Sequence, residues 1–195
     1  NMLWSQFEIN STTTENLVKQ WTSGQLEPNE QVTAPAADYQ RGFTLDFKIT
    51  LGDLSAGQEI AFAKCANGKT VELRTGEYGS VRLIMSDGLH TDSLDSDPGL
   101  IPAFGEHEVS VIVDNGPKII QFVVDGTVCN GRDFRQYGWG RFKSSMDDIR
   151  FDAIHVGELA IGQIRPRGKL TMLRIYNRPL MNTEAIGNYR NSFKN

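Results

Sequence analysis

The strictest constraint in this sequence is a nine-residue alternation of apolar and polar side chains, from Phe43 to Leu51. Odd-numbered positions in this segment are apolar and even-numbered positions are polar or charged, which is the period of a β-strand with one buried face. Shorter alternations follow around Ile60, Val81 and Val109, separated by turns rich in Gly, Asn and Asp. Short strands at this spacing predict an all-β, antiparallel sandwich.

The apolar positions of the strongest alternations are predicted to form the core of this sandwich. They are Phe43, Leu45, Phe47, Val109, Val111, Val113 and Phe122. The segment 118–124 is apolar on both parities, which predicts a central strand that is covered on both faces or interrupted by a bulge. Helix is scarce: one helix is predicted to begin at Asn182, whose side chain would cap the first turn, and a second helical interpretation covers Thr14 to Trp21.

Three long segments show no regular pattern: 27–40, 86–106 and 130–147. We expect ligand contacts in such loops if the sandwich is a scaffold. The sequence holds only two cysteines, Cys65 and Cys129, which would form either one disulfide or two buried free thiols.

Length and charge limit the classes of protein that need to be considered. A chain of 195 residues suits one large sandwich, so we expect a single domain over 1–195. The net charge is -4 and the basic residues are scattered, which argues against a nucleic-acid partner. No apolar run approaches the roughly 20 residues that a transmembrane helix needs. The first residues, Asn1 to Trp4, lack the pattern of a signal peptide, which favours a mature segment or one excised from a larger protein.

Four segments, taken in order, resemble one known family. The strand Phe43 to Phe47 is followed by the paired segments His107–Val113 and Phe122–Gly126, the second of which ends in an Asp-Gly turn. The segment Leu173–Leu180 then resembles the closing strand of laminin G-like, concanavalin A-like jelly rolls. This resemblance implies a concanavalin A-like antiparallel β-sandwich with a short C-terminal helix. Most members of that family bind carbohydrate or protein surfaces, and some are enzymes. Met181 stands where the family commonly has the Ser or Thr that caps the helix.

Catalytic patterns of this fold are incomplete in the sequence, so no catalytic residue is assigned. The paired-carboxylate strand of β-glucanases is absent, and the nearest cluster places Asp148, Arg150 and Asp152 on one face, as in a salt ladder. The lyase-like pairs Glu72–Arg74 and Ile154–His155 lack the neighbouring residues that such a site requires. His90 and His107 have no spacing typical of a metal pair.

Two loops remain as candidate sites. In the segment Asp133–Phe142, aromatic residues alternate with Gly and Arg, a composition suited to stacking on sugar rings and to hydrogen bonding with their hydroxyl groups. The residues predicted to bind carbohydrate in this loop are Arg135, Tyr137, Trp139 and Arg141. Alternatively, Trp139 and Phe142 fold back and plug the end of the sandwich.

The second loop, Ser86 to Gly99, is rich in aspartate. Its four carboxylates, Asp87, Asp92, Asp95 and Asp97, are candidate oxygen ligands for calcium. The alternative is an acidic loop that faces solvent and holds no metal.

These observations lead to one main hypothesis and two alternatives. The main hypothesis is a non-catalytic, lectin-like module that binds an oligo- or polysaccharide. The resemblance further implies an accessory role beside a polysaccharide-processing enzyme, at an extracellular, cell-surface or periplasmic location. The alternatives are a glycoside hydrolase or polysaccharide lyase on the same fold, and a jelly roll that serves protein interaction or structure.

Overall fold

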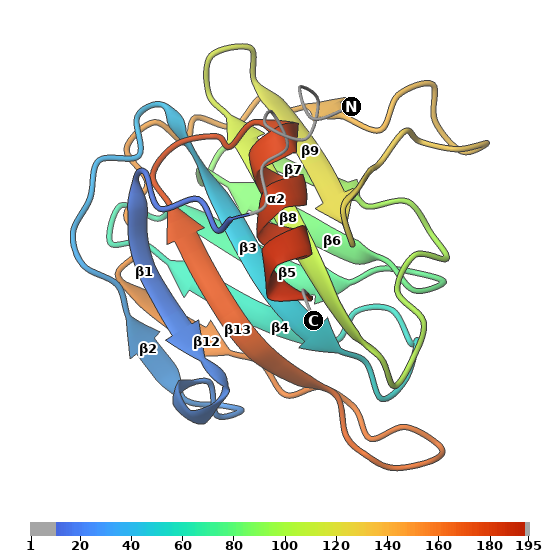
Figure 1. Cartoon of the computed structure of the whole chain (residues 1–195). Helices are drawn as coiled ribbons and strands as arrows, with labels where there is room; N and C mark the ends of the chain where they lie inside the picture. The colour runs from blue at the N-terminus through green and yellow to red at the C-terminus, as the bar shows by residue number, and fades with distance from the viewer. Residues whose placement is uncertain (1–10, 194–195) are drawn as a thin grey trace.

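The computed structural model describes residues 11–193, and it forms two antiparallel sheets stacked as a sandwich (Figure 1). The residues from Asn1 to Trp4 lie outside this range. Sheet A follows the order β1-β13-β3-β8-β9-β10, with β11 paired to β9, and sheet B follows the order β2-β12-β4-β5-β6-β7. This arrangement confirms the predicted sandwich.

The strands of sheet A are β1 (Leu17–Thr22), β3 (Gly42–Thr50), β8 (Glu106–Asp114), β9 (Ile119–Val124), β10 (Thr127–Val128), β11 (Gly140–Arg141) and β13 (Lys169–Tyr176). Those of sheet B are β2 (Gln31–Thr33), β4 (Glu59–Lys64), β5 (Thr70–Thr75), β6 (Val81–Ser86), β7 (Thr91–Asp95) and β12 (Ala153–Val156). A short 3-10 helix, η1 (Ser23–Gln25), follows β1, and α2 (Asn182–Ser192) closes the described chain.

The core lies between the two sheets, and all seven predicted core residues are in it. Each of them is at most 4% exposed to solvent. The central position predicted for segment 118–124 is also confirmed, because β9 pairs with β8 on one edge and with β10 and β11 on the other.

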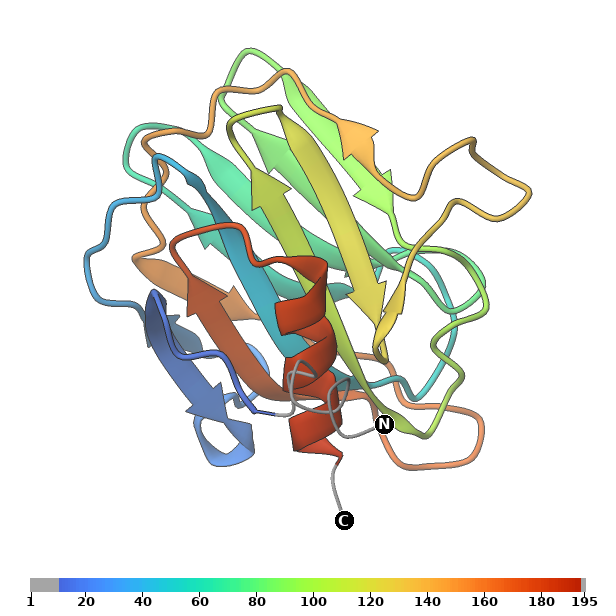
Figure 2. The ribbon, with the colours of Figure 1, turned by 45° about the horizontal axis from the view of Figure 1, so that its top comes forward.

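The expectation of one buried face for Phe43 to Leu51 is wrong, because α2 packs against the outer face of sheet A (Figure 2). A small apolar cluster that includes Ile112, Tyr176 and Ala185 joins the helix to the sheet. Asp46, on the polar face of β3, is therefore fully buried, and its Oδ2 accepts a hydrogen bond at 2.9 Å from the Arg174 guanidinium.

Three local expectations also need correction. The segment from Thr14 to Trp21 is not helical: it contains most of β1, which pairs with β13. None of the three long stretches is wholly irregular, because 27–40 holds β2, 86–106 holds β7 and 130–147 holds β11. The helix starts at Asn182, but Met181 occupies the N-cap position, and its backbone N–H donates to Glu184 Oε1 at 2.9 Å.

Cys65 and Cys129 are both buried and free, so the two-thiol alternative describes this structure. The Cys65 thiol donates to the Arg150 carbonyl oxygen at 2.9 Å, whereas Cys129 Sγ accepts the Asp97 N–H at 3.4 Å. Among residues 11–193, no helix has the length and apolar character needed to cross a membrane.

Candidate functional site

A groove of about 790 Å³ opens on the outer face of sheet B, at its β6–β7 edge. Register pairs Arg82 with Asp95 and Ile84 with Ser93, so these four side chains share the solvent-facing side of the sheet. Loops 77–80, 96–98 and 131–135 complete its walls. We call it the arginine groove, after Arg82 and Arg135, which line it.

Both arginines are held in fixed positions. The Arg82 guanidinium donates from Nε to Asp95 Oδ1 at 2.8 Å and from Nη2 to Asp95 Oδ2 at 3.0 Å. This pair raises the pKa of Arg82, so its positive charge is permanent. Arg135 Nη2 donates to the Asp95 carbonyl oxygen at 2.9 Å, while its buried Nη1 has no hydrogen-bond partner among the described residues. Arg135 Nη2 also lies 3.6 Å from Asp97 Oδ1, and Glu77 lines the groove as well, so carboxylates balance the charge of both arginines.

Two exposed aromatic side chains border the same groove. Tyr78 and Phe134 are each 73% exposed, although large aromatic residues usually bury much of their surface. Tyr78 also adopts a φ of 55°, a left-handed conformation that costs energy in a residue with a side chain. The ring faces can stack on the apolar faces of sugars, and Ser93 and Thr91 add hydroxyl groups nearby.

The four residues predicted to bind carbohydrate fall in two places. Arg135 lines the arginine groove. Tyr137 and Trp139 stack on each other outside it, with ring centroids 4.8 Å apart and planes 14° from parallel. The Arg141 guanidinium lies 5.8 Å from the centroid of the Trp139 ring. Phe142 is the residue that plugs the sandwich, since it is 3% exposed, whereas Trp139 is only half-buried.

Three of the four aspartates proposed as calcium ligands instead accept hydrogen bonds from backbone N–H groups of the segment 130–145. Asp87 accepts the Ser145 N–H at 2.7 Å, and Asp92 accepts the Ser144 N–H at 2.7 Å. Hydrogen bonds from backbone N–H groups, that of His90 first, hold the pKa of Asp87 well below its usual value.

Asp97 accepts the N–H groups of Asn130 at 2.9 Å and Gly131 at 3.0 Å, while Asp95 is engaged by Arg82. No group of three or more His, Cys, Asp or Glu side chains in residues 11–193 is placed to hold a metal ion. The four carboxylates thus do not converge on one point, and calcium binding stays a prediction.

The residues of the incomplete catalytic patterns have ordinary ionic partners. Glu72 and Arg74 pair with each other on β5, and His155 Nε2 lies 3.5 Å from Glu59 Oε2. Asp147 and Asp148 lie in a turn, residues 149–152 form no strand, and Asp148 pairs with Lys69. The salt ladder expected for Asp148, Arg150 and Asp152 is therefore wrong.

Sequence reasoning missed Tyr78, Phe134 and Arg82 as functional candidates. Phe134 lies inside the loop that the sequence singled out, so its aromatic type was a usable signal. Tyr78 and Arg82 come from a turn and a strand that carry no motif, and only the folded sheet brings them to Arg135.

No protein-family model matches this sequence, and no curated protein matches it either. Solved structures do match. The CBM40 domain of the Ruminococcus gnavus IT-sialidase, bound to α2,3-sialyllactose, aligns with a TM-score of 0.56 and 14% identity over 87% of this chain and 97% of its own. A pentraxin from Limulus polyphemus aligns with a TM-score of 0.56 and 14% identity over 92% of this chain and 84% of its own.

Part of a larger enzyme has the same fold. The leech intramolecular trans-sialidase aligns with a TM-score of 0.58 and 11% identity over 89% of this chain and 28% of its own. At these identities the likeness is one of fold. The chain therefore has the concanavalin A-like lectin/glucanase jelly-roll fold, and its structural neighbours include carbohydrate-binding modules.

Proposed function

We propose that this chain is a non-catalytic carbohydrate-binding module whose glycan occupies the arginine groove. The observation that carries this proposal is the meeting of two exposed aromatic rings, Tyr78 and Phe134, with two fixed arginines in one groove. Stacking on ring faces and hydrogen bonding to hydroxyl groups are the two means by which proteins hold sugars in water.

The two arginines are the groups that would meet a carboxylate on a glycan. A guanidinium binds a planar carboxylate through two parallel hydrogen bonds, so such a ligand would share Arg82 with Asp95, or Arg135 with Asp97. The CBM40 domain that shares the fold is bound to sialyllactose, whose sialic acid carries such a group. We therefore propose a sialylated or otherwise acidic glycan as the ligand class.

The stack of Tyr137, Trp139 and Arg141 is proposed as a second contact surface for a longer glycan. Its aromatic and cationic groups have the same chemistry as the groove. An accessory role beside a polysaccharide-processing enzyme, and an extracellular, cell-surface or periplasmic location, belong to the same proposal.

Titration calorimetry with α2,3-sialyllactose and with lactose tests the ligand class. We expect sialyllactose to bind with micromolar to millimolar affinity and lactose to bind at least about ten-fold more weakly, because lactose lacks the carboxylate. Equal affinities would show that the arginines do not bind the carboxylate of sialic acid. If a broad glycan array gave no binding at all, the proposed function itself would be wrong.

Alanine variants test the place of binding. Phe134→Ala and Tyr78→Ala should each lower the affinity about five-fold through the loss of roughly 1 kcal/mol of stacking. Their melting midpoints should hardly change, because both side chains are largely exposed. Leu89→Ala, which removes an 88% exposed side chain elsewhere, is the matched control. A loss in Tyr137→Ala but not in Phe134→Ala would move the primary site to the aromatic stack.

A further inference from the structure

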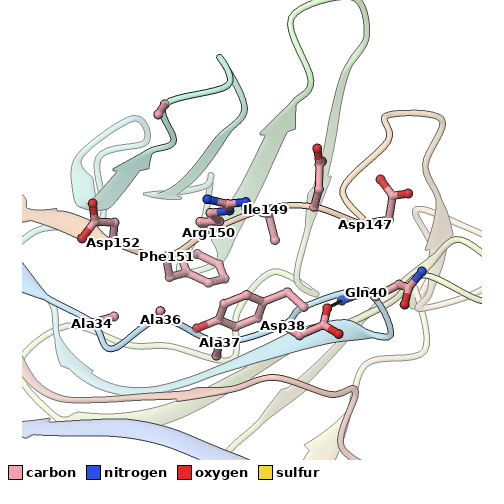
Figure 3. Close-up of a pocket in the computed structure, with 13 residues that line it drawn as sticks. Ala34, Ala36, Ala37, Asp38, Gln40, Asp147, Ile149, Arg150, Phe151 and Asp152 are labelled. Carbon is pink, nitrogen blue, oxygen red and sulfur yellow. Dashed lines mark hydrogen bonds between the residues drawn. The ribbon is translucent and has the colours of Figure 1, made fainter.

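A second groove, of about 910 Å³, has no part in the proposed glycan site (Figure 3). Two segments, 34–40 and 147–152, form its walls, and Ala66 completes its lining. The two segments are joined at one end, where the Ala34 N–H donates to the Asp152 carbonyl oxygen at 2.7 Å. No residue in the range 11–193 lines both this groove and the arginine groove. We call it the acidic groove.

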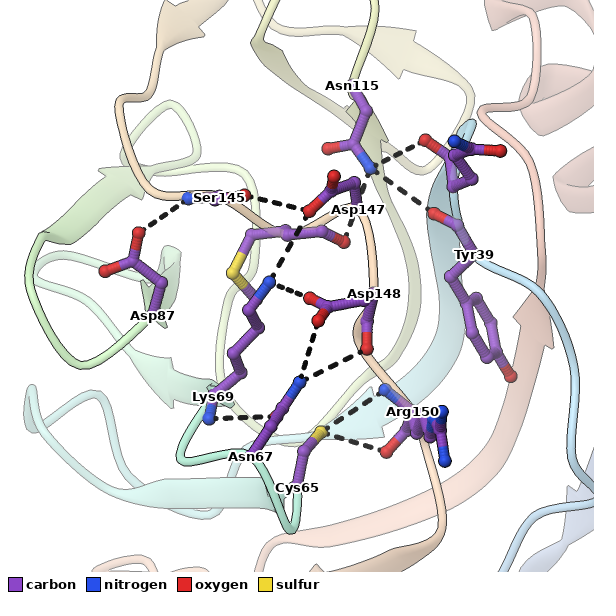
Figure 4. Close-up of polar contacts among 12 residues, drawn as sticks. Tyr39, Cys65, Asn67, Lys69, Asp87, Asn115, Ser145, Asp147, Asp148 and Arg150 are labelled. Atoms are coloured by element: carbon purple, nitrogen blue, oxygen red, sulfur yellow. Dashed lines mark hydrogen bonds and ion pairs between the residues drawn. The ribbon is translucent and has the colours of Figure 1, made fainter.

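The walls of the acidic groove are fixed by polar contacts with the rest of the fold (Figure 4). The Asn115 side-chain amide donates to the carbonyl oxygens of Gln40 at 3.1 Å and Met146 at 3.4 Å, which ties the two walls together. On the opposite side, Cys65 exchanges hydrogen bonds with the backbone of Arg150. A ligand would therefore meet a groove that is already formed, which lowers the entropic cost of binding.

Negative charge dominates the rim. Its carboxylates are those of Asp38, Asp147, Asp148 and Asp152, and Arg150 is the one basic residue among the described residues that line it. Lys69, which is only 8% exposed, lies behind the wall and pairs with Asp148 and, at 3.5 Å, with Asp147. A hydrogen bond from Ser145 lowers the pKa of Asp147, so this carboxylate stays ionised. The rim therefore favours a cationic ligand.

Below the carboxylates, the described lining is mostly apolar and includes one buried hydroxyl group, that of Tyr39. Phe151 and Ile149 are buried, and Ala36 and Ala37 leave space where larger side chains would fill the groove. Tyr39 is 1% exposed, and its hydroxyl has no hydrogen-bond partner among residues 11–193. Burial raises the pKa of this hydroxyl, so it keeps its proton and remains a donor. An unmatched buried donor costs stability unless an acceptor arrives.

We propose that the acidic groove binds an extended peptide segment that carries lysine or arginine. A peptide supplies all three complementary groups: a backbone carbonyl for the Tyr39 hydroxyl, cationic side chains for the rim, and small apolar side chains for the alanine wall. A neutral glycan lacks the cation, and a simple amine lacks the carbonyl.

The probe is a six-residue, end-capped peptide that alternates lysine and valine, titrated by fluorescence anisotropy against the whole chain. A peptide with glutamate in place of lysine is the control. We expect binding of the lysine peptide that weakens as salt rises, and at least about ten-fold weaker binding of the glutamate peptide, because the rim is acidic. Equal binding of both peptides, or of neither, would overturn the proposal.

Two variants separate the groove from general attraction to an acidic protein. Ala36→Trp fills the groove with an exposed wall residue and changes no charge, so it should lower the affinity at least about ten-fold. Asp152→Asn removes one rim carboxylate, and Asp133→Asn removes an exposed carboxylate elsewhere as a matched control. Equal losses in the two asparagine variants, or undiminished binding in Ala36→Trp, would refute a groove site.

Tyr39→Phe removes only the unmatched hydroxyl and stays informative if Ala36→Trp fails to fold. If the Tyr39 hydroxyl donates to the peptide, Tyr39→Phe should lower the peptide affinity about five-fold. The melting midpoint of the variant should be unchanged or higher, because no unmatched buried donor remains. Unchanged affinity would contradict the proposed hydrogen bond between the Tyr39 hydroxyl and a backbone carbonyl of the peptide. Tyr78→Ala should leave peptide binding intact, so failure of this inference and failure of the glycan proposal are distinguishable.

Discussion

At the scale of single residues, two buried carboxylates share one arginine beneath α2. Arg174 Nη1 lies 2.9 Å from Asp46 Oδ2 and 4.0 Å from Glu108 Oε2. Glu108 is 2% exposed, and its oxygens have no hydrogen-bond partner among the described residues. Burial, followed by the charge of Asp46, raises the pKa of Glu108 to about 9. Glu108 is therefore protonated at neutral pH, and one positive charge balances one negative charge.

This pKa predicts how stability depends on pH. The folded-state pKa of about 9 lies above the ordinary value of 4.5, so folding takes up a proton between these two values. The contribution of Glu108 is fully present below about pH 4.5 and is lost as the pH rises towards 9. Glu108→Gln keeps the shape and cannot ionise, so its free energy of unfolding should fall less over this range. Urea denaturation at several pH values measures the free energy of unfolding of both proteins. If this free energy changed with pH in the same way in both, the raised pKa of Glu108 would be contradicted.

The same residues show where prediction from sequence stops. Alternation identified the apolar face of β3 correctly, because a strand fixes which side chains share a face. It could not show that Asp46 is also buried, because a polar face looks the same whether water or a polar helix covers it. Only Ala185, Gly187 and Asn188 of α2 are buried, so the helix carries little apolar signal of its own.

At the scale of elements, Asn188 is the polar anchor of α2. Its Nδ2 donates to Asp46 Oδ2 at 2.9 Å and to the Tyr176 hydroxyl at 3.1 Å, and its Oδ1 accepts the Thr13 N–H at 2.8 Å. One side chain thus ties the helix to β3, to β13 and to the segment before β1.

We predict that Asn188→Ala lowers the free energy of unfolding by about 1 to 3 kcal/mol, because it leaves buried partners unsatisfied. Arg190→Ala, an exposed change on the same helix, is the control and should shift it by less than about 0.5 kcal/mol. Urea denaturation gives the free energies, and amide exchange shows whether α2 loosens first. Equal effects of the two substitutions would mean that the hydrogen bonds of Asn188 do not contribute to the free energy of unfolding.

The candidate site shows a similar limit at this scale. The loop Asp133–Phe142 was identified by composition, and it does supply Phe134 and Arg135. Its partners were not identified, because β7 has the sequence Thr-Asp-Ser-Leu-Asp, which resembles a loop, and because Tyr78 lies in a separate turn. The sequence suggests the four aspartates as metal ligands, but the oxygens of Asp87, Asp92 and Asp97 accept backbone N–H groups, which depends on where the loop 130–145 folds.

At the scale of the whole molecule, the two grooves are separate sites on a rigid scaffold. They share no lining residue in the described part of the chain, and a closely packed core lies between the two sheets. Hydrogen bonds of Asn115 hold the walls of the acidic groove, and those of Asp97 hold the loop at the arginine groove. Coupling between sites requires an element with two arrangements that both ligands can bias.

We therefore predict that sialyllactose and the lysine–valine peptide bind independently. The dissociation constant of the peptide should change by less than about two-fold when sialyllactose is saturating, and reciprocity requires the same factor in the reverse titration. Anisotropy titrations at constant ionic strength measure both directions, with lactose as the neutral control for added sugar. Weaker peptide binding by ten-fold or more would mean that the ligands compete for one site, and tighter binding by that factor would reveal a conformational change. Either result would contradict the rigid two-groove description.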